Sequence, residues 1–400
     1  MDFAQILSSF GGGAFTIIAF VVALSVIVAI HEYGHYIVGR WCGIYAAGVG
    51  ETGEVSEADV RRSMAGAPLW ARSLTVLAGP VFNFILAIAI FAGIAMTDGR
   101  STDPLTYESG RDLPAQFTSE LRAGDQILRV EGLPFGTDDP VIQELPYRAT
   151  LSYDILRAGE PMTVTGPYLM PPAVTGINPR SAADDAGLRK NDVITAIDGK
   201  PVVAFAQLVA AVQAADGAPL ALDVWRAGEV AKFTLAPRRV DIPLREGGFE
   251  TRWLIGVTGA VFFDEATTRL GVWESLTGAT RQLTFILTSS LSGLWNVITG
   301  QISSCNLSGP VGIAQTSGTM AAQGATSFVW FLGMLSAAVG LLNLFPVPVL
   351  DGGHLVFHAY EAVAGRKPSD RAINVLMMTG LVLIGAMMVF ALLNDLVLCP

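Results

Sequence analysis

Four long apolar stretches divide the sequence, at roughly 14–40, 69–96, 327–350 and 373–397. A helix needs about 20 mostly apolar residues to cross a bilayer, and each stretch is long enough. Charged residues gather between the second stretch and the third, in 98–272. This alternation of apolar and charged blocks predicts a polytopic α-helical membrane protein with four transmembrane helices.

The charged block contains an internal repeat. "RAGDQILRVEG" at 122–132 aligns with "RKNDVITAIDG" at 189–199, an offset of 67, and "DILRAGE" at 154–160 aligns with "DVWRAGE" at 223–229, an offset of 69. Each copy has a Gly-Asp or Asn-Asp turn, an apolar strand that ends at glycine, and a later hairpin that turns at Ala-Gly. Period-two alternation, as in "LALDVW", is typical of half-buried strands. The repeat predicts two β-rich domains inserted between the second and third transmembrane helices.

The two copies resemble PDZ domains, and the second, with "SAADDAGLRKNDVITAIDGKPV", is the clearer one. A PDZ domain offers a sheet edge and a groove for an extended peptide. The alternative is that both copies are β-rich spacers that bind nothing. The segment after them is amphipathic, and we expect its helices to lie on the outer membrane surface. The predicted division is 1–96 for the first two transmembrane helices, 97–170 and 171–260 for the two PDZ-like domains, 261–326 for the surface helices, and 327–400 for the last two transmembrane helices.

Composition supports a membrane protein and argues against one class of partner. Of the 400 residues, 51% are hydrophobic and 15% are charged, and the mean hydropathy is +0.49. Soluble domains carry about 25% charged residues. The net charge of −10 predicts that the protein does not bind nucleic acid. Three cysteines without a Cys-x-x-Cys motif predict neither a disulfide framework nor a thiolate zinc site.

Basic residues near the helix ends predict the orientation of the chain. Those between the first two helices and between the last two are Arg40, Arg61, Arg62, Arg72, Arg366, Lys367 and Arg371. Both short loops are therefore expected in the cytoplasm, and both termini and residues 98–326 outside it. The N-terminus has Asp2 in place of a basic region and no cleavage site, so we expect it to be retained.

The stretch "IVAIHEYGHYIVGRW" carries candidate chemistry at the end of the first apolar run. His31 and His35 are four residues apart, so on a helix they project from one face and can grip one zinc ion. Glu32, one step around the helix, is placed to take a proton from water that the zinc activates. Ionisable residues at membrane depth are costly and usually functional. The motif predicts a catalytic zinc site that needs a third protein ligand.

The third ligand is predicted in "NLFPVPVLDGGH", at the end of the third apolar stretch. Asp351 interrupts an apolar run and is followed by two glycines. Two prolines break the helix there and free backbone groups, which are tolerated at membrane depth where they line a buried or wet cavity. Asn343 is a neutral donor and acceptor in that wall, able to hold a substrate backbone or an oxyanion. His354 and His358 form a rival ligand set with Asp351, but they lack a glutamate placed like Glu32.

Five blocks carry a resemblance to a known family along nearly the whole chain. They are HEYGH at 31–35, "AGPVFNF" at 78–84, the two PDZ-like copies, "NLSGPVGIA" at 306–314 and "NLFPVPVLDGGH" at 343–354. In their order and spacing the chain resembles the site-2 protease family of intramembrane zinc metalloproteases. The resemblance implies His31, His35 and Asp351 as Zn²⁺ ligands, Glu32 as the catalytic base, and Asn343 as a residue that handles substrate.

The same resemblance implies partners and a location. The family cuts single-pass membrane protein substrates, such as anti-sigma factors or signal-peptide remnants, after another protease has shortened their outer part. The tandem PDZ-like domains are expected to filter substrates by size. The protein is expected in the bacterial inner membrane and in contact with lipid, with its active site towards the cytoplasm.

One segment departs from the family pattern. Members usually carry a membrane-reentrant β-hairpin after the first helix, which is expected to present an extended substrate strand to the zinc. Here "CGIYAAGVGETGEVSEADVRRSMAGAPLWAR" joins Cys42 to Arg72 without a visible pair of alternating apolar strands. The sequence therefore predicts either that the protein lacks this hairpin or that a piece of the sequence is missing there. Either outcome bears on substrate presentation and not on the metal ligands.

Two other classes of protein compete with an intramembrane endopeptidase. A PDZ-bearing membrane scaffold or adaptor with a non-catalytic metal site would keep zinc but cleave nothing. A transporter with broken helices would also place Asn, Asp and Pro at membrane depth. A transporter has no use for HExxH and two PDZ-like copies, so the endopeptidase and the scaffold remain, and the effect of Glu32→Gln on cleavage discriminates between them.

Overall fold

The computed structural model describes residues 12–45, 63–64, 66–135, 144–244, 248–303, 305 and 308–398. The chain divides into two compact units. One, which we call the membrane unit, comprises Met1–Ile94 and Val272–Pro400, and the other, the β-rich unit, is Ala95–Gly271. Each unit has its own buried apolar clusters.

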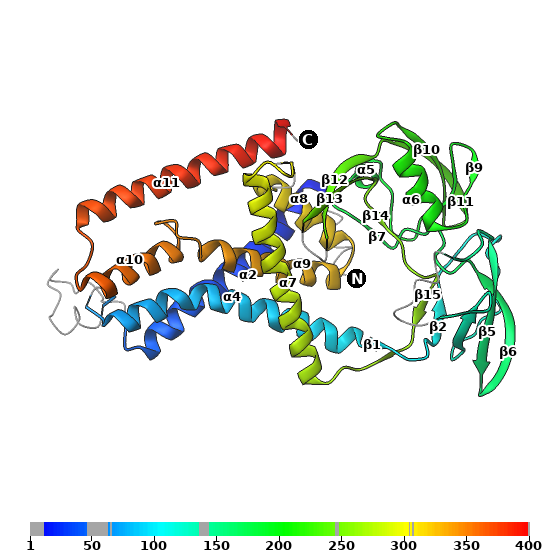
Figure 1. Cartoon of the computed structure of the whole chain (residues 1–400), viewed down its shortest axis with the longest axis horizontal. Coiled ribbons are helices and arrows are strands. Elements are labelled where there is room, and N and C mark those ends of the chain that lie inside the picture. The colour runs from blue at the N-terminus through cyan, green and yellow to red at the C-terminus, as the bar shows by residue number, and fades with distance from the viewer. Residues whose placement is uncertain are drawn as a thin grey trace. The chain divides into compact units, whose positions relative to one another are not determined.

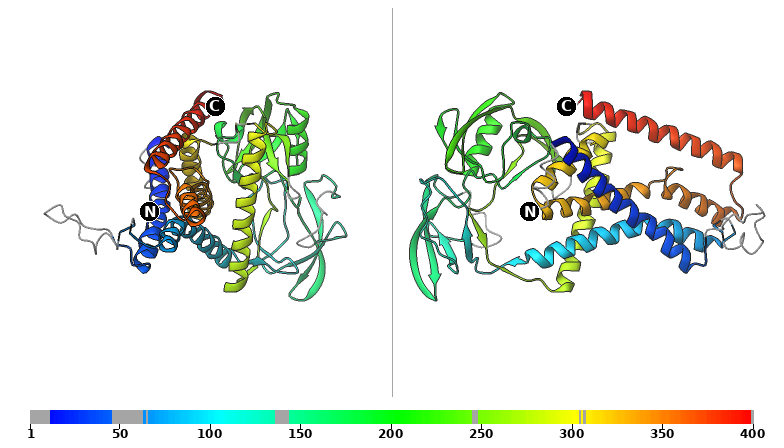
Figure 2. Two further views of the ribbon diagram at one scale, coloured as in Figure 1. Left: turned by 60° about the vertical axis from the view of Figure 1, so that its left-hand side comes forward. Right: turned by 180° about the vertical axis from the view of Figure 1, so that it is seen from behind.

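The membrane unit is built from helices (Figures 1 and 2). Their bounds are α2 (Gly12–Trp41), α4 (Leu69–Asp98), α7 (Val272–Ile298), α8 (Pro310–Ala322), α9 (Ala325–Asn343), α10 (Asp351–Ala364) and α11 (Asp370–Leu393), which continues as a π-helical turn, η3 (Asn394–Leu398). In the part of the chain that the structure describes, four helices are long and apolar enough to cross a membrane: Gly13–Trp41, Leu69–Asp98, Ala325–Asn343 and Asp370–Leu398. This agrees with the four predicted stretches.

The third spanning helix is shorter than its apolar stretch predicts. Helix α9 ends at Asn343, seven residues before the apolar run does, and α10 begins at Asp351. Pro346 and Pro348 lie in the interruption. Neither can supply the N–H that a continuing helix requires, which accounts for the break. The predicted break is confirmed, and it leaves Asp351 at the start of a new helix.

Small residues let α2 and α4 pack closely. A Cβ added at Gly34 of α2 would lie 2.7 Å from the carbonyl oxygen of Ala78 in α4. Close backbone approach of this kind is how helices associate where lipid is the solvent. The consequence is that side chains of α2 and α4 meet directly around the HExxH motif.

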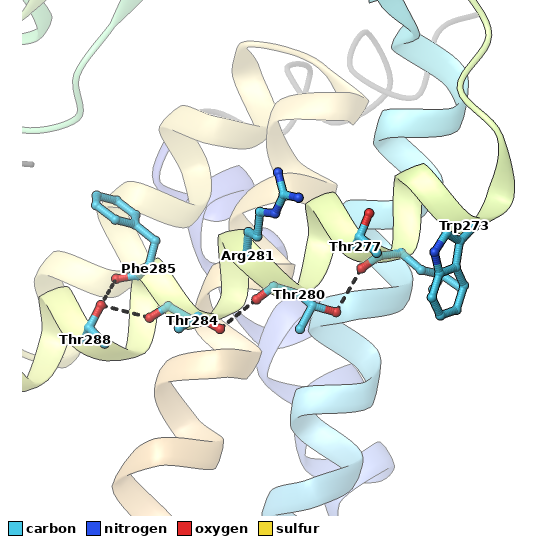
Figure 3. Close-up of a pocket in the computed structure, with 8 residues that line it drawn as sticks. Trp273, Thr277, Thr280, Arg281, Thr284, Phe285 and Thr288 are labelled. Atoms are coloured by element: carbon cyan, nitrogen blue, oxygen red, sulfur yellow. Dashed lines mark hydrogen bonds between the residues drawn. The ribbon is translucent and has the colours of Figure 1, made fainter.

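Helix α7 packs one face on the membrane unit and exposes another. Ala279 and Leu283 are buried against α4 and α9. On the exposed face, the hydroxyls of Thr280, Thr284 and Thr288 donate to carbonyl groups one turn earlier (Figure 3). These hydroxyls are therefore satisfied within the helix, and the charged side chain of Arg281 lies among them. The predicted membrane-surface position of 261–326 stays a prediction.

The β-rich unit contains two four-stranded antiparallel sheets with the same strand order, β4-β3-β5-β6 and β9-β8-β10-β11. The first comprises β3 (Gln126–Val130), β4 (Leu133–Pro134), β5 (Thr150–Arg157) and β6 (Glu160–Pro167). The second comprises β8 (Val193–Ile197), β9 (Lys200–Pro201), β10 (Leu220–Arg226) and β11 (Glu229–Leu235), with helices α5 (Ala182–Asp185) and α6 (Phe205–Ala214). Two-stranded ladders complete the unit: β1 (Arg100–Ser101) with β16 (Thr267–Thr268), β2 (Tyr107–Gly110) with β15 (Phe263–Glu265), β7 (Gly176–Ile177) with β14 (Val257–Thr258), and β12 (Arg238–Pro243) with β13 (Phe249–Leu254).

One buried ion pair recurs in both sheets at the repeat offsets. Arg157 donates to Asp125 at 2.8 and 2.7 Å, and Arg226 donates to Asp192 at 2.6 Å through each of two nitrogens. Both aspartate side chains are 1% exposed. Burial alone would raise the pKa of Asp125, but hydrogen bonds from Arg157 and the Arg122 backbone hold it below its usual value. The internal repeat is therefore confirmed as a structural repeat, and the PDZ identity of each copy stays a prediction.

The structure corrects the expectation about the cysteines and does not test the expectation about the substrate-presenting hairpin. Cys42 carries a free thiol, whereas Cys305 is disulfide-bonded. The prediction of no disulfide framework needs correction at Cys305, because an odd count and wide spacing do not reveal a pairing made by the fold. The segment expected to lack the substrate-presenting hairpin lies mostly in 46–62, outside the described residues.

Candidate metal centre

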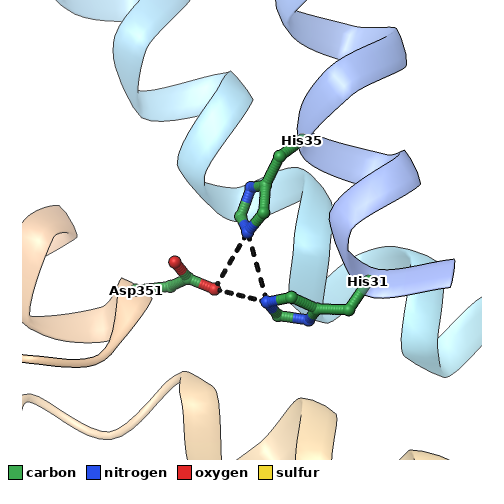
Figure 4. A group of neighbouring side chains, drawn as sticks. All are labelled: His31, His35 and Asp351. Carbon is green, nitrogen blue, oxygen red and sulfur yellow. Dashed lines mark hydrogen bonds and ion pairs between the residues drawn. The ribbon is translucent and has the colours of Figure 1, made fainter. Parts of the chain in front are cut away.

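Helices α2 and α10 bring three candidate metal ligands to one point (Figure 4). His31 and His35 project from one face of α2, as their spacing predicts, and Asp351 is the first residue of α10. Oδ2 of Asp351 lies 3.1 Å from Nε2 of His31 and 3.4 Å from Nε2 of His35. The two Nε2 atoms are 3.2 Å apart. The three side chains therefore form a triangle of ligand atoms, and they are only 11–22% exposed.

The glycines after Asp351 make its position possible. A Cβ at Gly352 would lie 2.3 Å from the carbonyl oxygens of Leu344 and Phe345, and one at Gly353 would lie 2.3 Å from that of Val347. The first turn of α10 thus packs directly on the backbone that follows α9. No other residue type fits there without moving this turn, which places Asp351 opposite α2.

Helix α4 fixes the proton of His35. Its Nδ1 lies 2.8 Å from the carbonyl oxygen of Thr75, which can only accept a hydrogen bond. Nδ1 therefore carries the proton, and in a neutral imidazole Nε2 is left with a lone pair that points at the centre of the triangle. This is the arrangement of histidine ligands in metalloproteins, which usually donate their second N–H to a carbonyl or carboxylate.

The triangle fits zinc. Ligand atoms about 2.0–2.2 Å from a tetrahedral zinc ion lie about 3.3 Å from one another, close to the three distances above. Oδ2 of Asp351 is buried and receives no hydrogen bond. Two imidazoles and one carboxylate also match the donor set of catalytic zinc sites, which keep a fourth position open.

The two remaining candidate residues, Glu32 and Asn343, are not part of this triangle. Glu32 is exposed on α2, next to His31. Asn343 ends α9, and its side-chain amide donates to the Val339 carbonyl one turn earlier at 3.1 Å. Among the described residues, no hydrogen bond joins Asn343 to the three ligand side chains.

The rival ligand set is not assembled. Nδ1 of His358 lies 3.1 Å from the hydroxyl of Ser73, and the His354 ring meets the edge of Phe357. Within the described part of the chain, Asp351 groups with His31 and His35 and not with these two histidines. The geometry therefore favours the HExxH pair.

Sequence reasoning missed the contribution of α4. Thr75, Gly79 and Asn83 are spaced four residues apart and share one face, next to the two imidazole rings. The signal was present: an asparagine inside an apolar span is costly and therefore a candidate functional residue.

Comparison with known proteins identifies the class and then the family. Site and fold together are those of a membrane-embedded zinc metalloprotease. The profile of peptidase family M50, the site-2 protease family, matches residues 19–387, so the chain belongs to this family. It is 29% identical to a protein of Agrobacterium fabrum named as a zinc metalloprotease, over 95% of each chain. It is 29% and 27% identical to regulator of sigma-E protease RseP of Salmonella typhimurium and Escherichia coli, over 94% of this chain and 97% of each relative.

Proposed function

We propose that this protein is an intramembrane endopeptidase that cleaves the transmembrane segments of single-pass membrane proteins. The observation that carries the proposal is the convergence of His31, His35 and Asp351 beside spanning helices. A protease site built there acts on a chain segment that is itself in the membrane. The alternative, a PDZ-bearing scaffold, would not need a metal site that a substrate can reach.

Each candidate residue has a proposed role. His31, His35 and Asp351 hold the zinc, which when bound supplies Lewis-acid activation of water and of the peptide carbonyl. Glu32 takes the proton from the attacking water and passes it to the leaving amine. Asn343 holds the substrate backbone or the developing oxyanion, after its amide turns from the Val339 carbonyl.

The proposed substrates are anti-sigma factors or signal-peptide remnants that another protease has already shortened. Relatives named as regulators of sigma-E protease support the first of these classes. A spanning helix hides its carbonyls in hydrogen bonds four residues apart, so the substrate must unwind at the cleavage point. The two PDZ-like domains are proposed to exclude substrates whose outer part is still intact.

The proposed orientation puts both termini and the PDZ-like domains outside the cytoplasm, in the inner membrane. Arg72, at the start of α4, pairs with Glu361 of α10 at 2.7 Å, which supports a common side for the two basic loops. Asp395, beyond α11, accepts hydrogen bonds from Gly309 and Gly312 at the start of α8. The disulfide at Cys305, near that opposite end, fits an oxidising compartment.

The test is Glu32→Gln in the full-length protein, reconstituted in bilayers with a single-span reporter. We expect zinc content to equal that of the wild type and cleavage to be lost, because glutamine cannot accept the proton. Glu108→Gln, in the exposed part of β2, is the control and should cleave normally. Cleavage that persists in Glu32→Gln contradicts the proposed mechanism, and a wild type that binds zinc but never cleaves favours the scaffold.

A further inference from the structure

Asn83 is a fully buried asparagine in the middle of a membrane-spanning helix. Its side-chain Nδ2 lies 3.3 Å from Nδ1 of His31. Its Oδ1 is buried and has no hydrogen-bond partner. Burying an amide oxygen without a hydrogen bond costs free energy, so we looked for a function of this side chain that offsets the cost.

Packing between helices does not supply that function. The hydroxyl of Ser336 in α9 donates to the backbone carbonyl of Asn83 at 2.9 Å. Because this bond uses the backbone, any residue at position 83 could accept it. The side-chain amide is therefore directed at His31 alone among the described residues.

The chemistry of His31 indicates what the amide does. His31 points Nε2 at the other two ligand atoms, so that nitrogen must carry a lone pair when it binds zinc. A neutral imidazole has one N–H, which then lies on Nδ1 and needs an acceptor. For His35 the acceptor is the Thr75 carbonyl, and for His31 the group at that position is the Asn83 amide.

A half-turn of the amide about its Cβ–Cγ bond exchanges Oδ1 and Nδ2. It puts Oδ1 opposite Nδ1 of His31, where the oxygen can accept the Nδ1 proton, and it moves Nδ2 to the buried position that Oδ1 now occupies. We propose that Asn83 is a positioning residue that accepts this proton, fixes the tautomer and ring orientation of His31, and so raises zinc affinity. The inference rests on the proposed assignment of His31 as a zinc ligand.

Three variants of the full-length protein test it by zinc affinity, measured by chelator competition. Asn83→Leu keeps the branched shape but has no acceptor, and we expect about 10–100-fold weaker zinc binding. Asn83→Asp keeps the shape and the acceptor, and should bind zinc at least as tightly as the wild type. Ser336→Ala removes the neighbouring buried hydrogen bond without touching the amide, and should leave zinc affinity unchanged.

The visible spectrum of the cobalt-substituted protein is a second readout, which should change in Asn83→Leu and not in Ser336→Ala. Wild-type affinity in Asn83→Leu overturns the proposal. If Asn83→Leu does not fold, Asn83→Asp decides, because a 10-fold loss of affinity there excludes a role as acceptor. His31→Ala separates the two claims: zinc affinity unchanged in that variant contradicts the ligand assignment, whereas a loss there with none in Asn83→Leu contradicts only the role of Asn83.

Discussion

Gly79 leaves the space in which the two imidazole rings lie. A Cβ built at Gly79 would be 2.4 Å from Nε2 of His35 and 2.8 Å from Cε1 of His31. Contacts this short require one of the rings to move. Because both rings also meet Asp351, movement of either one opens the ligand triangle.

Gly79→Ala is therefore expected to lower zinc content sharply, even though alanine favours a helix over glycine by about 1 kcal/mol. Gly93→Ala is the matched control on the same helix, because nothing lies within 4 Å of a Cβ there. Zinc per protein, measured by elemental analysis after purification, checks the prediction. Equal zinc content in the two variants would show that the rings do not depend on the space at Gly79.

At this scale the sequence predicts what is local and misses what the packing of helices creates. His31 and His35 are related by one helical turn, so their convergence follows from spacing alone. Thr75 acts through its backbone carbonyl, a group that every residue has, so no sequence pattern identifies it. Asn83 is visible as a polar residue in an apolar span, but its partner depends on how α2 packs on α4.

A buried ion pair connects α4 to α10, the helix that begins with the candidate ligand Asp351. Arg72, at the start of α4, donates two hydrogen bonds to Glu361 of α10, at 3.1 and 2.7 Å. The two side chains are 10% and 17% exposed. Asp351 begins the same helix as Glu361, so the pair holds α10 against the helix that orients His35.

Glu361→Ala should destabilise the protein by about 3–5 kcal/mol, because it leaves the Arg72 charge buried without a partner. The exchanged pair, Arg72→Glu with Glu361→Arg, should recover part of this loss and of the zinc content. Glu250→Ala is the control, since its partner Arg252 is 49% exposed and exposed ion pairs contribute little to stability. Thermal unfolding in detergent measures both effects, and an exchanged pair as unstable as Glu361→Ala would argue against a direct interaction.

Element boundaries show where sequence patterns mislead. The apolar run to residue 350 predicts a longer third helix than α9, because hydropathy does not register that Pro346 and Pro348 end it. The prolines themselves predicted the break correctly. The need for glycine at 352 and 353 could not be predicted, since it arises from contact with the backbone of 344–347.

For the whole molecule, the arrangement of spans and inserted β-rich unit followed from composition and repeats. Four apolar stretches and two offsets of 67 and 69 were enough to divide the chain. The disulfide at Cys305 was not foreseen, because pairing depends on which chain segments the fold brings together. Orientation stays a prediction, and the free thiol of Cys42 offers a direct way to test it.

In intact spheroplasts, Cys42 should resist a membrane-impermeant maleimide and react only after permeabilisation, because it follows the first spanning helix on the proposed cytoplasmic side. Glu229→Cys, at the exposed first residue of β11, should react without permeabilisation. Mass spectrometry of the labelled peptides separates the two sites. Labelling of Cys42 in intact spheroplasts would reverse the proposed topology.

We infer that the zinc centre cuts peptide bonds inside the membrane. The most direct measurement is mass spectrometry of the products formed when the purified protein, in bilayers of defined lipid, cleaves a single-span reporter. We expect one cut within the apolar span, towards its cytoplasmic end, and no product from Glu32→Gln. A cut in the flanking soluble segments, or the same product from Glu32→Gln, would contradict it.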